Sequence, residues 1–345
     1  MIPIQNIYYM LSYAFQILNE QGYKNIATEQ FNNTAELMAA ILEKGIAIQL
    51  KRGLRKEYIP QTEALSSLRG KIDIAESIKT QSMLRKQLIC TYDEFSVNSI
   101  MNRIIKSTVE LLLRSNISKQ RKKNLGKLMV YFSEVDLIDL HTINWNVQYN
   151  RNNQTYRMLI SICYLVVKGL LQTQSDGSTK LMDFLDEQRM CRLYEKFILE
   201  YYRREFRNQI TANASQIPWQ LDNDENSMLP VMQSDIMLQR DDRVLIIDAK
   251  YYEHSTQVQF DKHTLHSGNL YQIFTYVKNK EYELREKKHM VSGMLLYAKT
   301  DEEIYPNNVY QMSGNQITVR TLDLNLPFDE IARQLNIIAK SHFNL

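Results

Sequence analysis

Two aspartates and a lysine stand at a spacing that can support chemistry on phosphate esters. Twelve residues separate Asp235 from Asp248, and Lys250 follows two positions later. The alternating segment 234–239, a charged turn and the apolar run 244–248 together predict a β-hairpin. Since side chains alternate along a strand, Asp248 and Lys250 should share one face. We therefore expect both carboxylates and the ammonium group to converge at one end of the hairpin.

Such a trio suits metal-dependent hydrolysis of a phosphodiester. The carboxylates of Asp235 and Asp248 are hard ligands that Mg²⁺ prefers, and the ion would polarise the phosphate and activate a water. Lys250 would orient that water and offset developing charge. The plain alternative is a hairpin with two surface aspartates and a lysine beside them, because the pattern is short. The apolar run that leads into Asp248 favours the catalytic interpretation.

Two predicted helices could complete the site. The upstream helix carries Glu195 and Glu200, which are five positions apart and cannot share a face, so only one should join the site. A solvent-exposed ion pair is the alternative for either. The downstream helix carries Gln272 and Tyr276, four positions apart and therefore on one face. These two residues either line a cleft or belong to an amphipathic core helix.

Other candidate metal ligands are weaker. Three histidines lie in the loop between the hairpin and the downstream helix: His254, His263 and His266. No two of them have the i, i+4 spacing of a helical zinc site, so we assign them no metal and leave phosphate or DNA contact open. The three cysteines include no CxxC pair, which argues against a zinc knuckle or a disulfide framework.

The composition is that of a globular protein. Apolar residues make up 44% and charged residues 23% of 345 residues, and the net charge is +3. This charge permits an anionic partner without requiring one. No stretch reaches the ~18 apolar residues of a membrane span, and the amino terminus lacks the features of a signal peptide. We therefore expect a cytoplasmic protein without a membrane partner.

Apolar spacing predicts helices over residues 4–18, 34–48, 99–113, 158–171, 184–206 and 269–279. The basic segment 51–79 has glycine and proline punctuation and predicts short strands and loops. An asparagine-rich stretch at 141–153 suggests a boundary, so we expect an α+β domain at 1–148 and a second domain at 149–345. In the second domain, helices around the hairpin and a strand at 291–298 predict a mixed α/β sheet.

The basic segment offers a contact surface for DNA or a partner protein, with an ordinary exposed face as the alternative. Its candidate residues are Arg52, Arg55, Lys56, Arg69 and Lys71. The chain contains no GxxxxGK[ST] sequence, so it should not hydrolyse nucleotides by a P-loop mechanism.

Nearly the whole chain resembles the McrC family of restriction nuclease subunits. The resemblance rests on IPIQNIYYMLSYAF, RGLRKEY with LRGKID, CTYDEFSVNSIMNRIIKSTVELLL, LYEKFILEYYRRE, LPVMQSDIMLQRDDRVLIIDAKYY and HSGNLYQIFTYV. It implies a carboxy-terminal domain of the PD-(D/E)xK class, a restriction-endonuclease-like mixed sheet flanked by helices. It also implies an amino-terminal domain that engages McrB, a hexameric AAA+ GTPase that recognises modified cytosine. One departure is that Pro230 lies five residues before Asp235.

The resemblance assigns metal binding to the two hairpin aspartates and catalysis to the aspartates and Lys250. It favours Glu195 as the third acid, and it places Gln272 and Tyr276 along the cleft in contact with DNA. It implies Mg²⁺-dependent cleavage of double-stranded DNA that contains modified cytosine, with GTP used by the partner. Two alternatives stay open: a stand-alone nuclease resembling the RecB-like repair enzymes, and a non-catalytic adaptor of an AAA+ motor.

Overall fold

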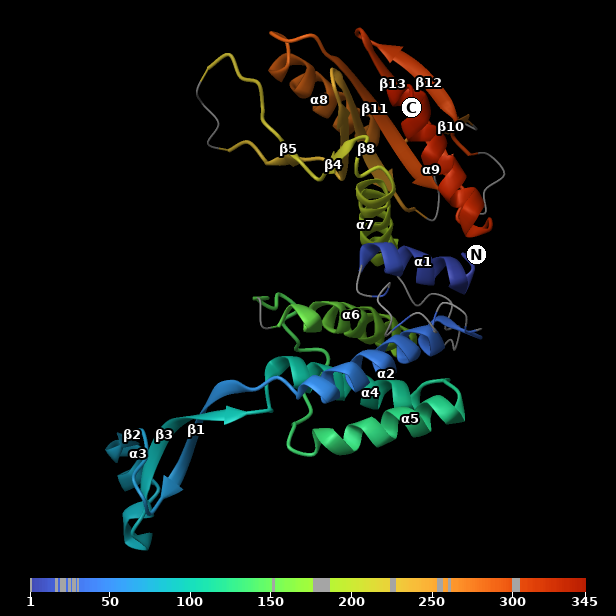
Figure 1. Cartoon of the computed structure of the whole chain (residues 1–345). Helices are drawn as coiled ribbons and strands as arrows, with labels where there is room; N and C mark the ends of the chain where they lie inside the picture. The colour runs from blue at the N-terminus through green and yellow to red at the C-terminus, as the bar shows by residue number, and fades with distance from the viewer. Residues whose placement is uncertain are drawn as a thin grey trace. The chain divides into compact units, whose positions relative to one another are not determined.

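The computed structural model describes residues 2–15, 18, 23, 26, 29, 31–150, 153–175, 187–223, 228–252, 257–259, 262–299 and 305–345. The chain forms two units (Figure 1). The helical unit is Phe31–Phe184, and the sheet unit joins Met1–Gln30 to Leu185–Leu345.

Four helices build the core of the helical unit: α2 (Thr34–Arg52), α4 (Ile100–Arg114), α5 (Lys119–Met129) and α6 (Gln154–Ser175). The first three begin at side-chain caps, because Asn33, Ser99 and Ser118 each accept a hydrogen bond from a backbone N–H three residues on. Glu36 on α2 accepts hydrogen bonds from Ser118 and Arg121, so one carboxylate joins α2 to α5. Within the described residues, no helix is long and apolar enough to cross a membrane.

A small antiparallel sheet projects from the helices of the same unit and is called the arm, residues 57–96 (Figure 1). It consists of β1 (Glu57–Leu65), β2 (Lys71–Asp73), α3 (Ile74–Lys79), a 3₁₀ turn (Ser82–Arg85) and β3 (Leu88–Ser96). The sheet order is β1-β3-β2. Gly70 has a φ of +67°, and a Cβ at this position would collide with the Thr91 carbonyl. The short strands expected in this stretch are present, and α3 follows them.

A six-stranded mixed sheet forms the centre of the sheet unit, as expected. Its order is β12-β13-β11-β8-β7-β4. The strands are β4 (Thr211–Asn213), β7 (Ile236–Arg240), β8 (Arg243–Lys250), β11 (Met290–Ala298), β12 (Asn308–Met312) and β13 (Asn315–Leu322). β8, β11 and β13 run parallel, and the outer pairs are antiparallel. Two short ladders accompany it: β5 (Gln216–Ile217) with β6 (Met232–Gln233), and β9 (Gln257–Gln259) with β10 (Lys262–Thr264).

Helices cover both faces of this sheet. They are α7 (Glu187–Glu205), α8 (Ser267–Glu283) and α9 (Phe328–Phe343), and α1 (Ile4–Ala14) packs against α7. On one face, Ile273 of α8 belongs to the same apolar cluster as Leu295 of β11. On the other face, Ile338 of α9 lies near the side chains of β8, β11 and β13 that point away from α8, such as Leu245, Met294 and Thr318. α7 packs with α9, where the Tyr202 hydroxyl donates to the Leu335 carbonyl.

The division of the chain differs from the predicted division at residues 148 and 149. α1 belongs to the sheet unit, where the Tyr13 hydroxyl donates to Glu205 and Asn6 donates to the Leu324 carbonyl. α6, expected in the second domain, packs against α2 and α4 in the helical unit. The asparagine-rich stretch is a loop inside that unit, in which Asn153 bonds to the backbone of Asn150. Its polarity therefore marks a turn and not a domain boundary.

A close approach between α8 and the sheet requires a glycine on β11. A Cβ added to Gly293 would lie 2.8 Å from side-chain atoms of Ile273 and Ile317 and 2.9 Å from Val277. Such distances are shorter than real Cβ contacts, and the neighbours are packed core side chains that have little room to move. The position of α8 on the sheet thus depends on the absence of a side chain here.

We expect Gly293→Val to lower the free energy of unfolding by about 1–3 kcal/mol, because the added atoms overpack the core. Chemical denaturation of the full chain measures this change. Gly126→Ala on α5 is the control, since a Cβ there meets nothing within 4 Å; it should be stabilising by roughly 0.5–1 kcal/mol. Equal denaturation midpoints for Gly293→Val and the unmodified chain would contradict this account of α8.

Candidate active site

The predicted hairpin forms from β7 and β8 and brings the three chemical groups together. The two strands pair from Ile236 opposite Ile247 to Arg240 opposite Arg243. Asp235 comes directly before β7. Its Oδ2 accepts a 2.9 Å hydrogen bond from the backbone N–H of Ala249, which lies between Asp248 and Lys250. Lys250 Nζ lies 2.9 Å from Asp248 Oδ2. Two carboxylates and one ammonium group therefore meet at the end of β8.

Burial governs the electrostatics of this cluster. The Asp248 side chain is only 1% exposed. Burial raises the pKa of Asp248 to about 7; the charge of Lys250 opposes this shift and that of Asp235 adds to it. For Lys250, burial lowers the pKa, but the neighbouring Asp248 carboxylate outweighs burial and the net direction is upward. The pair thus contains a carboxylate whose ionised form is disfavoured by burial and favoured by a neighbouring cation.

The donor set fits a hard divalent cation. Among the described residues, Asp248 Oδ1 has no hydrogen-bond donor although it is buried. Such an orphaned carboxylate oxygen is costly unless a cation or water satisfies it. No group of three or more His, Cys, Asp or Glu side chains assembles as a metal site in the described part of the chain. A bound Mg²⁺ would therefore rely on Asp235 and Asp248 and complete its shell with oxygens from water or substrate.

α7 brings Glu195 to this cluster and leaves Glu200 out of it. The Cys191 thiol donates a 3.1 Å hydrogen bond to Glu195 Oε1. Burial and the charge of Asp235 raise the pKa of Glu195, so the two carboxylates interact. Glu200 instead forms an ion pair of 2.8 Å with Arg203. Of the two glutamates left open by the sequence, the structure brings only Glu195 together with the hairpin.

α8 contributes the predicted glutamine and tyrosine. Lys250 Nζ donates to Gln272 Oε1 at 3.3 Å, and Gln272 Nε2 donates to the Tyr276 hydroxyl at 3.0 Å. Tyr276 is also part of the apolar cluster beneath α8. Gln272 therefore contacts the lysine, while Tyr276 packs in the core as the amphipathic-helix interpretation predicts.

A second hydrogen-bonded chain next to the lysine was missed by sequence reasoning. The Tyr252 hydroxyl donates to Asn269 Oδ1 at 3.3 Å, and Asn269 Nδ2 donates to the Tyr297 hydroxyl at 2.9 Å. Tyr297 stands opposite Lys250 in the parallel register of β11 and β8. Asn269 thus ties the first turn of α8 to the ends of two strands. Its position three residues before Gln272, on the same helix face, was the available signal.

Of the three predicted histidines, His266 is the one whose side chain the structure describes. The His266 ring stands edge-on to Tyr252, with ring centroids 5.5 Å apart. His254 and the side chain of His263 lie outside the described residues.

The predicted basic residues belong to the helical unit and its arm. Several are engaged within the unit: Arg55 pairs with Glu57 at 2.6 Å, and the Arg69 guanidinium lies 4.2 Å from the Tyr92 ring centroid. Lys56 lies 5.9 Å from the ring centroid of Phe95. Two others, Arg52 and Lys71, are exposed.

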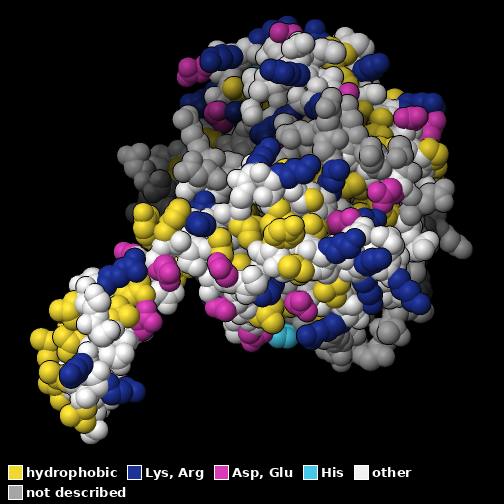
Figure 2. Space-filling view, turned by 60° about the horizontal axis from the view of Figure 1, so that its bottom comes forward, with side chains coloured by type: hydrophobic (Ala, Val, Ile, Leu, Met, Phe, Trp, Pro, Cys, Tyr) yellow, Lys and Arg dark blue, Asp and Glu magenta, His cyan; other side chains and the backbone are white. Residues whose placement is uncertain are grey.

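The arm also exposes large apolar side chains, which sequence reasoning overlooked. They are Tyr58, Leu68, Ile74, Ile78, Met83, Leu84 and Phe95. Leu84 is 81% and Tyr58 71% exposed. Figure 2 shows apolar side chains gathered over the projecting arm. An exposed apolar surface of this kind marks a site for protein contact.

Comparison with known proteins places the chain in a family. The sequence profile described as McrBC 5-methylcytosine restriction system component matches residues 5–298. The type IV methyl-directed restriction enzyme EcoKMcrBC of Escherichia coli (strain K12) is 29% identical over 342 residues, which are 97% of this chain and 96% of that protein.

Two solved assemblies from Thermococcus gammatolerans are also similar. A half-complex of McrB AAA+ hexamers with bound McrC matches with a TM-score of 0.48 and 18% identity, covering 97% of this chain and 76% of that chain. The cryo-EM McrBC complex matches with a TM-score of 0.42 and 22% identity, covering 59% of each. On the extent of the profile match, the chain belongs to the family of McrBC 5-methylcytosine restriction system components.

Proposed function

We propose that this chain is the DNA-cleaving subunit of its restriction system and hydrolyses phosphodiesters with Mg²⁺. The observation that carries the proposal is the buried Asp248 carboxylate, with one oxygen unsatisfied among the described residues, beside Asp235 and Lys250. Membership in a methylcytosine restriction family supports it, because such a system needs a component that cuts DNA.

The residues of the cluster divide the work. Asp235 and Asp248 would hold Mg²⁺, which supplies a Lewis acid and an activated water when bound. The backbone N–H of Ala249 orients Asp235, and Gln272 accepts a hydrogen bond from the Lys250 ammonium. Lys250 is thereby positioned to hold the attacking water and to offset negative charge on the phosphate. Glu195 stands beside Asp235 as a further proton acceptor.

Asn269 acts through this arrangement as a positioning residue. Lys250 is on β8 and Gln272 is on α8, so their hydrogen bond spans two elements. The Asn269 side chain joins the same helix turn to Tyr252 and Tyr297 and therefore holds α8 and the strand ends in register.

The partner is proposed to be a hexameric AAA+ GTPase that recognises modified cytosine. The Thermococcus gammatolerans half-complex contains McrC bound to McrB AAA+ hexamers, and the Escherichia coli relative is methyl-directed. This chain has no GxxxxGK[ST] sequence, so GTP would be used by that partner. The apolar arm is the surface that we assign to partner binding, because protein contacts bury apolar groups whereas DNA backbones attract charge.

The other two functions considered are less well supported. A stand-alone repair nuclease would gain nothing from an arm that keeps large apolar side chains in water. A non-catalytic adaptor would gain nothing from burying a carboxylate that lacks a full set of partners.

Removing the metal-binding charge should abolish cleavage. Because Asp248 is buried, Asp248→Asn is preferred, since it keeps the shape of the side chain. We expect it and Lys250→Ala to reduce cleavage of modified plasmid by several powers of ten in the presence of Mg²⁺, GTP and the cognate partner. Asp241→Asn is the matched control, because Asp241 lies on the exposed turn of the same hairpin. Cleavage by Asp248→Asn at the unmodified rate would refute the site.

Loss of the Asn269 clamp should slow cleavage without unfolding the sheet unit. We expect Asn269→Ala to lower the rate by about 10–100-fold and to raise the Mg²⁺ concentration needed for half-maximal rate. Asn279→Ala on the same helix is the control, because Asn279 accepts a hydrogen bond from the Gln220 backbone instead. The positioning role fails if both variants lose the same activity in proportion to their thermal stability.

Charge on the arm should uncouple the partner. We expect Leu84→Asp combined with Ile78→Asp to reduce stimulation of the partner GTPase by roughly tenfold or more, because a buried interface cannot accept unpaired carboxylates. Val130→Asp is the matched control, since Val130 is 71% exposed in the helical unit outside the arm. The isolated chain should hydrolyse no GTP. Full stimulation by the double variant would remove the arm from the interface.

A further inference from the structure

The acidic and basic side chains of α2 and α5 are segregated in the helical unit, where the two helices pack against each other (Figure 1). Arg121 of α5 is largely buried and pairs with both acids of α2, with Glu36 at 3.3 Å and with Glu43 at 2.7 Å. Asn124 of α5 donates a further hydrogen bond of 2.9 Å to Glu43. The carboxylates of this helix pair are therefore committed to the contact between the helices.

The exposed charged side chains of the same two helices are all basic. They are Lys44, Lys51 and Arg52 on α2 and Lys119, Lys123 and Lys127 on α5. Within the described residues, none of these six side chains forms a hydrogen bond or an ion pair. The three on α5, called here the lysine row, are spaced four positions apart and therefore follow one face of the helix over about 12 Å.

The lysine row lies in a stretch of sequence without acids. Between Glu110 and Glu134 there are six lysines and arginines and no aspartate or glutamate. The first turn of α5 has no acidic residue, although a carboxylate there would interact favourably with the helix dipole. Like charges four positions apart repel each other and destabilise an isolated helix. The row is thus unfavourable for the chain alone and becomes favourable when an anionic partner neutralises it.

Duplex DNA is the anionic partner that the lysine row fits. The phosphates of a duplex lie on its outside, where lysines contact them without reading the bases. Single-stranded nucleic acid is bound through aromatic side chains on which the bases stack, and neither α2 nor α5 contains an aromatic residue. A protein partner is less suitable, because protein interfaces are enriched in arginine and depleted in lysine.

We propose that the lysine row of α5 binds the phosphate backbone of duplex DNA independently of base sequence. The exposed basic side chains of α2 add to the positive potential. This inference rests on the proposed function, which makes DNA the substrate, and it gives the helical unit a part in holding that DNA. The arm of the same unit is assigned to the partner protein, so the two contacts use different surfaces.

The salt dependence of DNA binding tests this proposal. Fluorescence anisotropy of a labelled unmodified duplex is measured with the full chain, in EDTA and without GTP, between about 50 and 200 mM salt. Replacing Lys119, Lys123 and Lys127 together by glutamine should weaken binding by roughly tenfold or more at low salt. It should also reduce the slope of log affinity against log salt by about 2–3, since each phosphate contact contributes about 0.9. A methylated duplex should give the same values.

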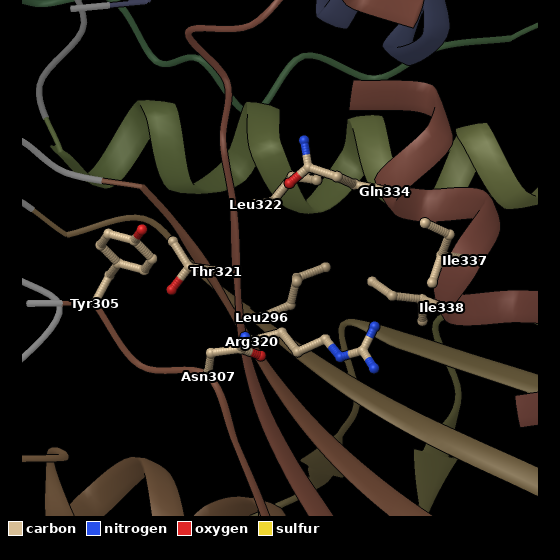
Figure 3. A pocket seen from close by; sticks show the side chains of 9 residues that line it. All are labelled: Leu296, Tyr305, Asn307, Arg320, Thr321, Leu322, Gln334, Ile337 and Ile338. Atoms are coloured by element: carbon tan, nitrogen blue, oxygen red, sulfur yellow. The ribbon is translucent and has the colours of Figure 1, made fainter. Parts of the chain in front are cut away.

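Two controls separate the lysine row from general attraction to positive charge. Lys71→Gln, Lys79→Gln and Lys86→Gln, combined in one variant, remove the same charge from exposed positions on the arm. Arg320→Gln removes one charge from the sheet unit. Arg320 lines a cavity of about 320 Å³ beside α9, and Figure 3 shows its side chain extending toward Ile338. Both control variants should keep the affinity and the salt slope of the unmodified chain.

The lysine row is excluded as a DNA contact if its triple variant keeps the unmodified affinity and slope, or if the arm variant loses as much. Tighter binding of an oligothymidylate with the same dependence on the row would identify a single strand as the occupant. Normal DNA binding with loss of partner GTPase stimulation would identify the partner protein. Asp248→Asn should bind the duplex normally, so failure of the cleavage proposal and failure of this inference are separate results. Thermal melting checks that each variant is folded.

Discussion

The sheet unit is organised around one buried charge. Asp248 ends the apolar run of β8 with its side chain almost wholly out of water, and Lys250 is the cation that lies against it. A buried pair gains little net stability, but loss of one partner costs about 3–5 kcal/mol. The neighbours serve this pair: a backbone N–H fixes Asp235 beside it, and Gln272 takes a hydrogen bond from the lysine. The fold thus maintains a carboxylate that a cation would complete.

Holding that charge requires α8 to lie close to the sheet. Gly293 permits the approach, since any side chain there would meet Ile273 and Ile317. Asn269 then fixes the helix along its axis by joining Tyr252 and Tyr297. Apolar packing sets the distance between α8 and the sheet, and the hydrogen bonds set its register. The two requirements meet at the carboxy-terminal ends of β8 and β11, where the catalytic groups are proposed to act.

Local periodicity made part of this arrangement predictable. Alternation along β8 placed Asp248 and Lys250 on one face, and the four-residue spacing of Gln272 and Tyr276 placed both on one face of α8. The two residues of each pair are close together in the sequence, so local spacing is enough to predict that they share a face. The expectations ended at residue 298 and omitted α9, although the helical spacing of its buried residues would have predicted that helix.

The domain boundary could not be read in the same way. Tyr13 and Glu205 are 192 positions apart, and no local pattern records that they bond. The asparagine-rich stretch was wrongly predicted to be a domain boundary. Its polarity is local and reflects turns within the helical unit. Side-chain geometry was also inaccessible from spacing: the positions of Glu195 and Glu200 allowed only one at the site. The interaction of Glu195 with Asp235 and the ion pair of Glu200 with Arg203 distinguish the two.

The arm has the opposite feature: it exposes apolar side chains to water, whereas the sheet unit buries a charge. A three-stranded sheet with one short helix has too few residues to cover both of its faces, so side chains such as Leu84 and Tyr58 stay exposed. Exposure of this kind is unfavourable for an isolated chain and becomes favourable when a partner covers it. The two units therefore solve different problems. One excludes water around a charge, where we propose that a cation acts, and the other retains an apolar surface, to which we propose that a second protein binds.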